Sequence, residues 1–272
     1  MNRKKILWIL GMAVCCLALY TIVISRIDRL EQVIFPGADG AYVSSDSASF
    51  AALNVTETPE PTVDIWPVID LTMPQYVIVN DSNPLTPSYK PDTGTISVTG
   101  YMQFSVLALP YLEDMLQAAQ DAGFSVYVGG AYRSYSYQET LFNGKASQIA
   151  SGKYGVTDYM DPLYQKAAAE ARTIVMFPGC SEHQLGLAVD LYDKVYYNYV
   201  YENMNQEFYA WLDEHCAEYG FIKRYPTRKL LLTGWDEPWH YRYVGVEAAT
   251  FIMENGLCYE EFYAHYNPDF RY

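Results

Sequence analysis

Apolar positions recur along the chain from about residue 76 onward, and their spacing alternates between that of helices and that of strands. Helical spacing or helical caps mark four segments: 105–121, 136–151, 161–176 and 206–219. A capping box of Ser136 and Glu139 begins the second of these, and an Asp161 N-cap followed by Pro162 begins the third. Shorter runs with strand character lie at 124–128, 187–192, 221–225 and 239–244, and helices are predicted at the C-terminal end.

The connections between the later strands favour hairpin-like returns over repeated βαβ units. We therefore predict an α+β fold, with a single catalytic domain over residues 76–272 and a central antiparallel sheet flanked by helices. Residues 27–75 are rich in Ser, Thr, Asp, Glu and Pro and have little apolar periodicity. Such a composition is typical of a linker or stalk.

The N-terminal 26 residues have a third pattern. An uncharged stretch of 19 residues runs from Ile6 to Ile24 and follows Arg3, Lys4 and Lys5. This length just spans a bilayer as a helix, and the basic cluster favours a cytoplasmic N-terminus. We expect residues 1–26 to form a cytoplasmic tip and a single transmembrane anchor, with the domain on the extracytoplasmic side of the cell membrane. A cleaved signal peptide is the alternative, although the stretch is long for one and no clear cleavage site follows it.

Composition and charge narrow the range of partners. Half of the 272 residues are apolar, which is enough for one packed domain. The formal net charge is −14, and because residues 1–26 carry four basic and no acidic side chains, residues 27–272 carry −18. Such a surface repels phosphate, so we expect no nucleic acid partner.

Three cysteines, Cys180, Cys216 and Cys258, lie in the predicted extracytoplasmic domain. An odd number cannot all pair within one chain, and a single disulfide between Cys216 and Cys258 is one option in an oxidising compartment.

The first chemically informative segment covers residues 181–191. His183 lies in a glycine-containing turn, and Asp190 follows between apolar residues of a predicted strand. A carboxylate buried there is costly unless a charged partner or a metal meets it. An imidazole and a carboxylate brought together across a tight turn suit zinc, which accepts nitrogen and oxygen ligands. Taken alone, a His and an Asp at this spacing are more often an ordinary surface pair.

A second segment, 233–245, adds His240 and Glu237. His240 would complete three protein ligands, the number typical of a catalytic zinc site. Glu237 precedes a proline, which keeps its backbone extended, and a turn there would bring the carboxylate beside the metal site. A carboxylate in that position can accept a proton from water and pass it to a leaving amine. An isolated glutamate would instead be a surface ion-pair partner.

The two segments, SEHQLGLAVD at 181–190 and EPWHYRYVG at 237–245, together resemble the paired motifs of the VanY-type D,D-carboxypeptidases. These zinc peptidases have the pattern Ser-x-His-(six residues)-Asp, followed later by Glu-x-x-His. Three further stretches agree with the family in the right order: 79–85, 132–138 and 220–226.

The resemblance implies a zinc enzyme that removes D-alanine from peptidoglycan stem peptides. It assigns zinc to His183, Asp190 and His240, and the catalytic base to Glu237. Arg133 matches the arginine that contacts the reacting peptide, where a planar cation can bind a carboxylate or an oxyanion. Substrate contacts are assigned to two further residues: Gln138 and Ser181.

Several alternatives to a D,D-carboxypeptidase stay open on the sequence. An L,D-carboxypeptidase acting on tetrapeptide stems would keep every motif, and an endopeptidase that cuts cross-links is a further option. A non-catalytic, zinc-containing wall-binding module would not need Glu237 beside all three ligands. A structural membrane protein would explain the anchor but none of the ordered polar motifs.

Overall fold

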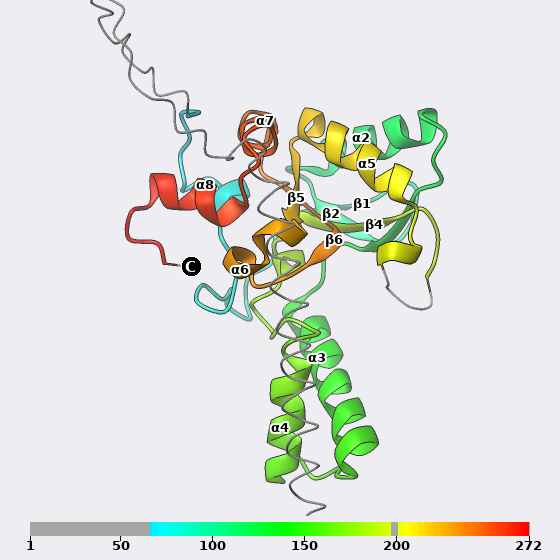
Figure 1. The fold of residues 1–272 in the computed structure, drawn as a ribbon, viewed down its shortest axis with the longest axis vertical. Coiled ribbons are helices and arrows are strands. Elements are labelled where there is room, and N and C mark those ends of the chain that lie inside the picture. Colours follow the sequence, from blue (N-terminus) through cyan, green and yellow to red (C-terminus); the bar gives the residue numbers. More distant parts are fainter. Residues whose placement is uncertain (1–65, 197–200, 272) are drawn as a thin grey trace, which may run out of the picture. The chain divides into compact units, whose positions relative to one another are not determined.

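The computed structural model describes residues 66–196 and 201–271, which belong to one compact unit, Val63–Tyr272 (Figure 1). Its central sheet is antiparallel throughout, with the strand order β3-β4-β6-β5. The four strands are β3 (Tyr127–Gly130), β4 (Ala188–Tyr192), β5 (Phe221–Tyr225) and β6 (Glu237–Tyr243). A separate antiparallel pair consists of β1 (Thr93–Thr95) and β2 (Gln103–Ser105). The predicted antiparallel α+β fold is thus confirmed.

Helices surround this sheet. The α-helices are α2 (Leu109–Asp121), α3 (Tyr135–Ile149), α4 (Pro162–Ala171), α5 (Gln206–His215), α6 (Leu230–Thr233), α7 (Val246–Glu254) and α8 (Tyr259–Tyr266). Shorter helical turns are η1 (Pro74–Tyr76), η2 (Ala150–Tyr154), η3 (Glu182–Leu185), η4 (Tyr201–Asn203), η5 (Cys216–Tyr219) and η6 (Thr227–Lys229). The predicted transmembrane anchor lies outside the described residues, and among the described helices none is long and apolar enough to cross a membrane.

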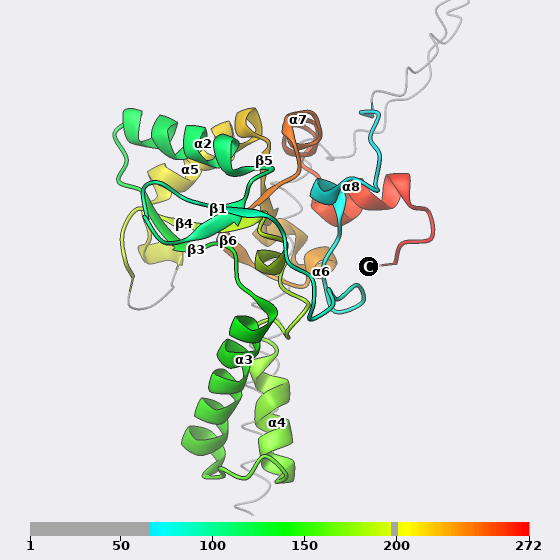
Figure 2. The same cartoon turned by 180° about the vertical axis from the view of Figure 1, so that it is seen from behind.

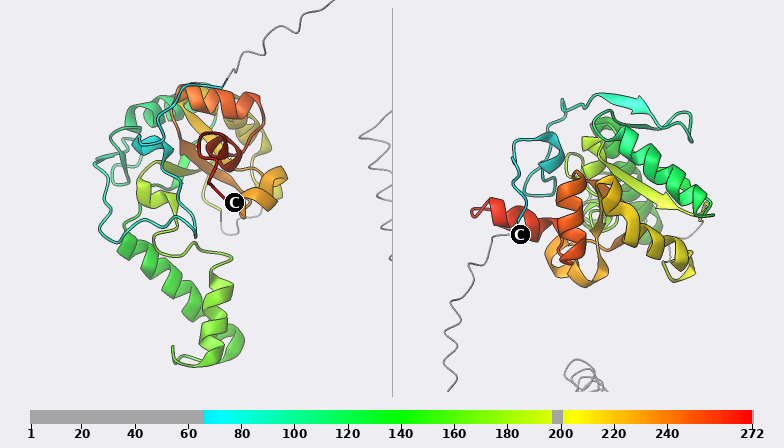
Figure 3. Two further views of the ribbon diagram at one scale, coloured as in Figure 1. Left: turned by 90° about the vertical axis from the view of Figure 1, so that its left-hand side faces the viewer. Right: turned by 90° about the horizontal axis from the view of Figure 1, so that it is seen from above.

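The two faces of the sheet have different roles. Helices α2 and α5 cover one face, and the hairpin of α3 and α4 extends away on the opposite side (Figures 1 and 2). Because side chains alternate along a strand, β4 directs Val189 and Leu191 into the apolar core and Asp190 to the other face. The left view of Figure 3 shows the same arrangement, with the hairpin extending away from the sheet.

A second apolar cluster joins the C-terminal helices α7 and α8 to the sheet. The segment from Trp66 also belongs to this cluster, upstream of the predicted domain start at residue 76. The Trp66 ring stacks on His265, with ring centroids 3.8 Å apart, so His265 is a packing residue.

Several element boundaries differ from the sequence predictions. Ser134, and not Ser136, caps α3, because its Oγ accepts a hydrogen bond from the Tyr137 amide at 3.2 Å. The Asp161 cap of α4 is confirmed by a 2.8 Å bond from the Leu163 amide, but the helix ends at Ala171, before residue 176. The predicted helix 105–121 starts later, because residues 103–105 pair with β1 as β2.

The disulfide considered between Cys216 and Cys258 does not form in the structure. Both are buried free thiols, as is Cys180. Cys216 packs in the main core at the end of α5, whereas Cys258 is the N-cap of α8, where its amide donates to the Glu261 carboxylate at 2.8 Å. Each cysteine therefore serves the packing of a different region.

Candidate metal centre and active site

Strand register brings Asp190 and His240 together. The two residues are paired across the antiparallel strands β4 and β6, so their side chains leave the same face of the sheet side by side. Asp190 Oδ1 lies 3.2 Å from His240 Nδ1. A pair separated by 50 positions in sequence thus becomes one half of a site through sheet pairing alone.

The turn before β4 supplies His183. Gly186 ends this 3₁₀ turn with a positive φ of 72°, a conformation that favours glycine, and the chain then enters the strand. His183 Nδ1 lies 2.8 Å from the Ala131 carbonyl oxygen, which can only accept a hydrogen bond. The proton is therefore on Nδ1, and Nε2 presents a lone pair 3.3 Å from Asp190 Oδ2.

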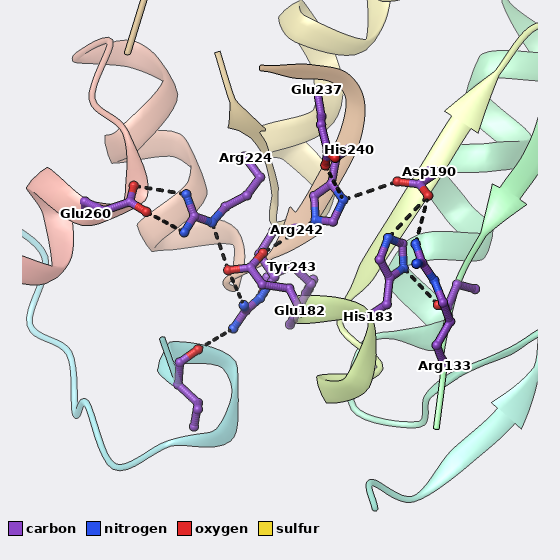
Figure 4. Close-up of polar contacts among 12 residues, drawn as sticks. Arg133, Glu182, His183, Asp190, Arg224, Glu237, His240, Arg242, Tyr243 and Glu260 are labelled. Atoms are coloured by element: carbon purple, nitrogen blue, oxygen red, sulfur yellow. Dashed lines mark hydrogen bonds and ion pairs between the residues drawn. The ribbon is translucent and has the colours of Figure 1, made fainter. Parts of the chain in front are cut away.

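His183, Asp190 and His240 form a three-donor group whose ligand atoms all lie within 4.8 Å of one another. Asp190 Oδ1 and His240 Nδ1 are buried without a hydrogen-bond partner of good geometry, as expected of atoms directed at a common ion (Figure 4). Two imidazole nitrogens and one carboxylate are a donor set suited to Zn²⁺, and three protein ligands are typical of catalytic zinc sites. The residues present therefore fit the metal that the sequence predicted.

The pKa values of the two histidines show how the three-donor group is protonated without a metal. Burial, together with the positive charge of Arg133, outweighs the nearby Asp190 carboxylate and lowers the pKa of His183 to about 4, so this imidazole is neutral, as a metal ligand must be. Burial also opposes the charged form of His240, but the adjacent carboxylates of Asp190 and Glu182 outweigh it and raise the pKa of His240 to about 9. Without a metal the acidic surroundings retain a proton on His240, and a bound cation would replace it.

Glu237 reaches the site because β6 is irregular at its start. Lys223 pairs with Tyr241 and Tyr225 with Glu237, so β6 has two more residues than β5 between these pairs. In a regular strand residues 237 and 240 would point to opposite faces, whereas here Glu237 Oε2 lies 3.5 Å from His240 Nδ1. Burial raises the pKa of Glu237 to about 7 in the metal-free protein, a range suited to proton transfer.

Arg133 lies on the other side of Asp190, with Nη2 3.4 Å from Asp190 Oδ2. Gln138, at the start of α3, accepts a bond from Arg133 Nη1 at 3.1 Å and donates to the Met176 carbonyl at 2.8 Å. Because Gln138 is only 1% exposed, the structure shows it holding the arginine in place. Its predicted role in substrate contact stays a prediction.

All predicted site residues line one cavity of about 860 Å³ between the sheet and the α3–α4 hairpin. They are Arg133, Gln138, Ser181, His183, Asp190, Glu237 and His240. Ser181 is 2% exposed, and its side chain caps no helix. Aromatic side chains of Tyr192, Trp235 and Trp239 line the same cavity.

Glu182 is a charged residue that the sequence analysis missed. It is fully buried, and its Oε2 lies 3.5 Å from Nε2 of His240, on the side of the ring away from Asp190. A carboxylate behind a metal-ligating histidine can orient the ring and select its tautomer, and a proton on Nε2 facing Glu182 would leave Nδ1 free to bind metal. The one signal that the sequence offered was its position next to the predicted ligand His183.

Two buried arginines surround Glu182 and are shown in Figure 4. Its Oε1 accepts from Arg224 Nε at 2.8 Å and lies 3.0 Å from Arg242 Nη1. Arg224 in turn makes a two-pronged contact with Glu260 of α8, at 3.0 and 2.6 Å. We call these four residues the arginine cluster, and we call His183, Asp190, His240, Glu237 and Arg133 the metal cluster.

Comparison with known proteins places this site in a family. The family model described as "VanY: D-alanyl-D-alanine carboxypeptidase" matches residues 103–246, just over half of the chain, including every residue of the metal cluster. The chain belongs to the VanY family.

Individual relatives agree with this assignment. A D-alanyl-D-alanine carboxypeptidase of Enterococcus faecalis (strain ATCC 700802 / V583) is 38% identical over 188 residues, which cover 68% of this chain and 64% of that protein. The match thus spans less than two thirds of that relative's own length. A solved VanY D,D-pentapeptidase in complex with Zn(II) superposes with a TM-score of 0.57 at 38% identity, covering 70% of this chain and 99% of that one. The LdcB LD-carboxypeptidase superposes with the same TM-score at 29% identity, covering 70% of this chain and 86% of that one.

Proposed function

We propose that this VanY-family chain is a zinc-dependent carboxypeptidase that hydrolyses the C-terminal D-alanine from peptidoglycan stem peptides. The observation that carries the proposal is the position of Glu237. Its carboxylate lies beside a buried three-donor group, in the same cavity as an arginine that can bind a carboxylate. The names of the relatives, a D-alanyl-D-alanine carboxypeptidase and a VanY with Zn(II), support the same chemistry.

Each residue of the metal cluster has its own role in the proposed hydrolysis. His183, Asp190 and His240 would hold Zn²⁺, which in such sites supplies a Lewis acid that polarises a carbonyl and acidifies water. Glu237 accepts the proton of the attacking water and transfers it to the amine that leaves. Arg133, held by Gln138, binds the free carboxylate of the substrate or the negative charge that develops on the carbonyl oxygen.

An L,D-carboxypeptidase acting on tetrapeptide stems is the second candidate. The similarity to the LdcB LD-carboxypeptidase supports it, and none of the metal-cluster residues distinguishes the two specificities. Digestion of defined tri-, tetra- and pentapeptide stems with mass-spectrometric detection separates them. Release of D-alanine from pentapeptides supports the D,D-specificity, and release from tetrapeptides alone supports the second candidate.

The same digestion tests the class of the protein. A metal chelator should stop the release, and added zinc should restore it. A protein that binds the stems and retains zinc but releases nothing would instead be a non-catalytic wall-binding module.

In this proposal the enzyme acts outside the cytoplasm, anchored by a single N-terminal helix. The support is the basic cluster before the apolar stretch of residues 6–24. Protease added to wall-free cells should release the domain, and a domain protected until the membrane is broken would contradict this topology.

A further inference from the structure

One face of α3 forms a wall of the catalytic cavity. Gln138, Leu141, Lys145 and Gln148 all line it, at the spacing of three and four residues that places side chains on one side of a helix. The opposite wall, after α4, presents the apolar side chains Ile174, Val175 and Met176. The cavity thus continues from the metal cluster along the hairpin.

Lys145 is the cation of this wall, and it lacks an acidic partner among the described residues. Its Nζ donates to the neutral Gln148 Oε1 at 3.3 Å. Two other cations of the same region are neutralised: Lys153 lies 2.7 Å from Glu170, and Arg172 lies 2.9 Å from Asp81. In a chain with a net charge of −14, a lysine in the substrate cavity without an acidic partner is available for an anionic ligand.

The position of Lys145 sets which part of a peptide it can reach. Gln138 contacts Arg133, the predicted anchor of the terminal carboxylate, and Lys145 is seven residues further along α3, about 10 Å at 1.5 Å per residue. An extended peptide covers that distance in about three residues. A substrate bound by Arg133 at its end would therefore place a residue two or three positions upstream beside Lys145.

We propose that Lys145 forms a subsite for a second carboxylate of the substrate, two or three residues before its C-terminal residue. The free carboxylate of a glutamate linked through its side chain, or a carboxylate on the side chain of the next residue, has the required chemistry. This inference rests on the proposed carboxypeptidase function and names the part of the stem that the cavity recognises.

The test compares synthetic pentapeptides that end in D-Ala-D-Ala and carry either a carboxylate or the matching carboxamide at one of the two upstream positions. The parent protein should hydrolyse the carboxylate peptide with a kcat/KM about two- to five-fold higher, the range of a solvent-accessible ion pair. Added salt should reduce this preference, because ions screen such a pair. The position at which the exchange matters identifies which carboxylate is bound.

Two variants connect the preference to Lys145. Lys145→Met should abolish it, and Lys145→Glu should reverse it in favour of the carboxamide, because like charges then meet. Lys166→Glu is the matched control, since Lys166 lies on α4 of the same hairpin, is exposed and does not line the cavity. It makes the same charge change and should leave the preference as it is in the parent.

The outcomes separate this inference from the function on which it rests. If the parent releases D-alanine equally well from the carboxylate and carboxamide peptides, or if Lys145→Glu keeps the parent preference, the subsite is wrong and the enzyme stands. If the zinc-loaded parent releases D-alanine from none of the peptides, the proposed function itself fails.

Discussion

The metal cluster and the arginine cluster meet at His240, whose ring lies between Asp190 of the first cluster and Glu182 of the second. The two clusters differ in how their charges are balanced. In the arginine cluster, Glu182 and Glu260 are matched by Arg224 and Arg242, and all four are buried. In the metal cluster, the described residues that pair with Asp190 and Glu237 are one arginine and two histidines.

This difference in charge balance indicates which of the two clusters needs a bound cation. Buried charges are tolerated when they are paired, and the arginine cluster meets that condition within the chain. The charges of the metal cluster are balanced only when a proton or a metal ion supplies positive charge, in agreement with the raised pKa of His240. We infer that the arginine cluster is a fixed support, whereas the metal cluster is built for a cation.

Breaking the arginine cluster should have the largest effect on stability. Arg224→Met leaves Glu260 buried without its partner, and loss of one member of a buried ion pair costs about 3–5 kcal/mol in the free energy of unfolding. Chemical denaturation of the domain from about residue 66 measures this cost.

Two further variants show whether charge is the cause. Adding Glu260→Gln to Arg224→Met removes the unpaired carboxylate and should recover part of the loss. Lys153→Met breaks an exposed ion pair with Glu170 and should leave the unfolding midpoint almost unchanged. Equal losses for Arg224→Met and Lys153→Met would show that burial of the arginine cluster does not matter.

A smaller effect, on metal affinity, should follow from Glu182→Gln. The glutamine keeps the shape but removes the negative charge 3.5 Å from His240 Nε2, and loss of such a partner weakens metal binding by about 10- to 100-fold. Competition with a chromogenic chelator measures the zinc dissociation constant of the folded protein.

Glu260→Gln is the matched control for this measurement. It removes the same charge from the arginine cluster without a contact to His240, so it should lower stability and leave the zinc affinity near the parent value. If both variants weaken zinc binding equally, general destabilisation and not the contact with His240 is responsible.

The sequence indicated the candidate metal ligands, but it did not indicate the buried charged residues that contact them. His183, Asp190 and His240 carry recognisable spacing, and the strands that hold Asp190 and His240 were found near their true limits. Glu182 was missed because its partners, Arg224 and Arg242, lie 42 or more positions away and only folding brings them together.

The sequence also did not show which of two similar residues takes a given structural role. Ser134 and Ser136 can both cap a helix, but α3 begins at Tyr135, so Ser134 takes the extended backbone conformation of the cap. The approach of Glu237 to His240 depends on the irregular pairing of β5 and β6, since the regular strand period would place these side chains on opposite faces. The sequence analysis expected this approach from a turn at Glu237 and from the resemblance to the family, and not from strand periodicity.

The most direct test of the account is the turnover of Glu237→Gln with zinc bound. Glutamine keeps the shape of the side chain but cannot accept the proton of water at neutral pH. Zinc content and stem-peptide affinity should match those of the parent, while the rate of D-alanine release should fall by about 10²- to 10⁴-fold, the range for a positioned proton-transfer group. Release at the parent rate by the zinc-loaded variant would contradict the assignment of Glu237 as the base.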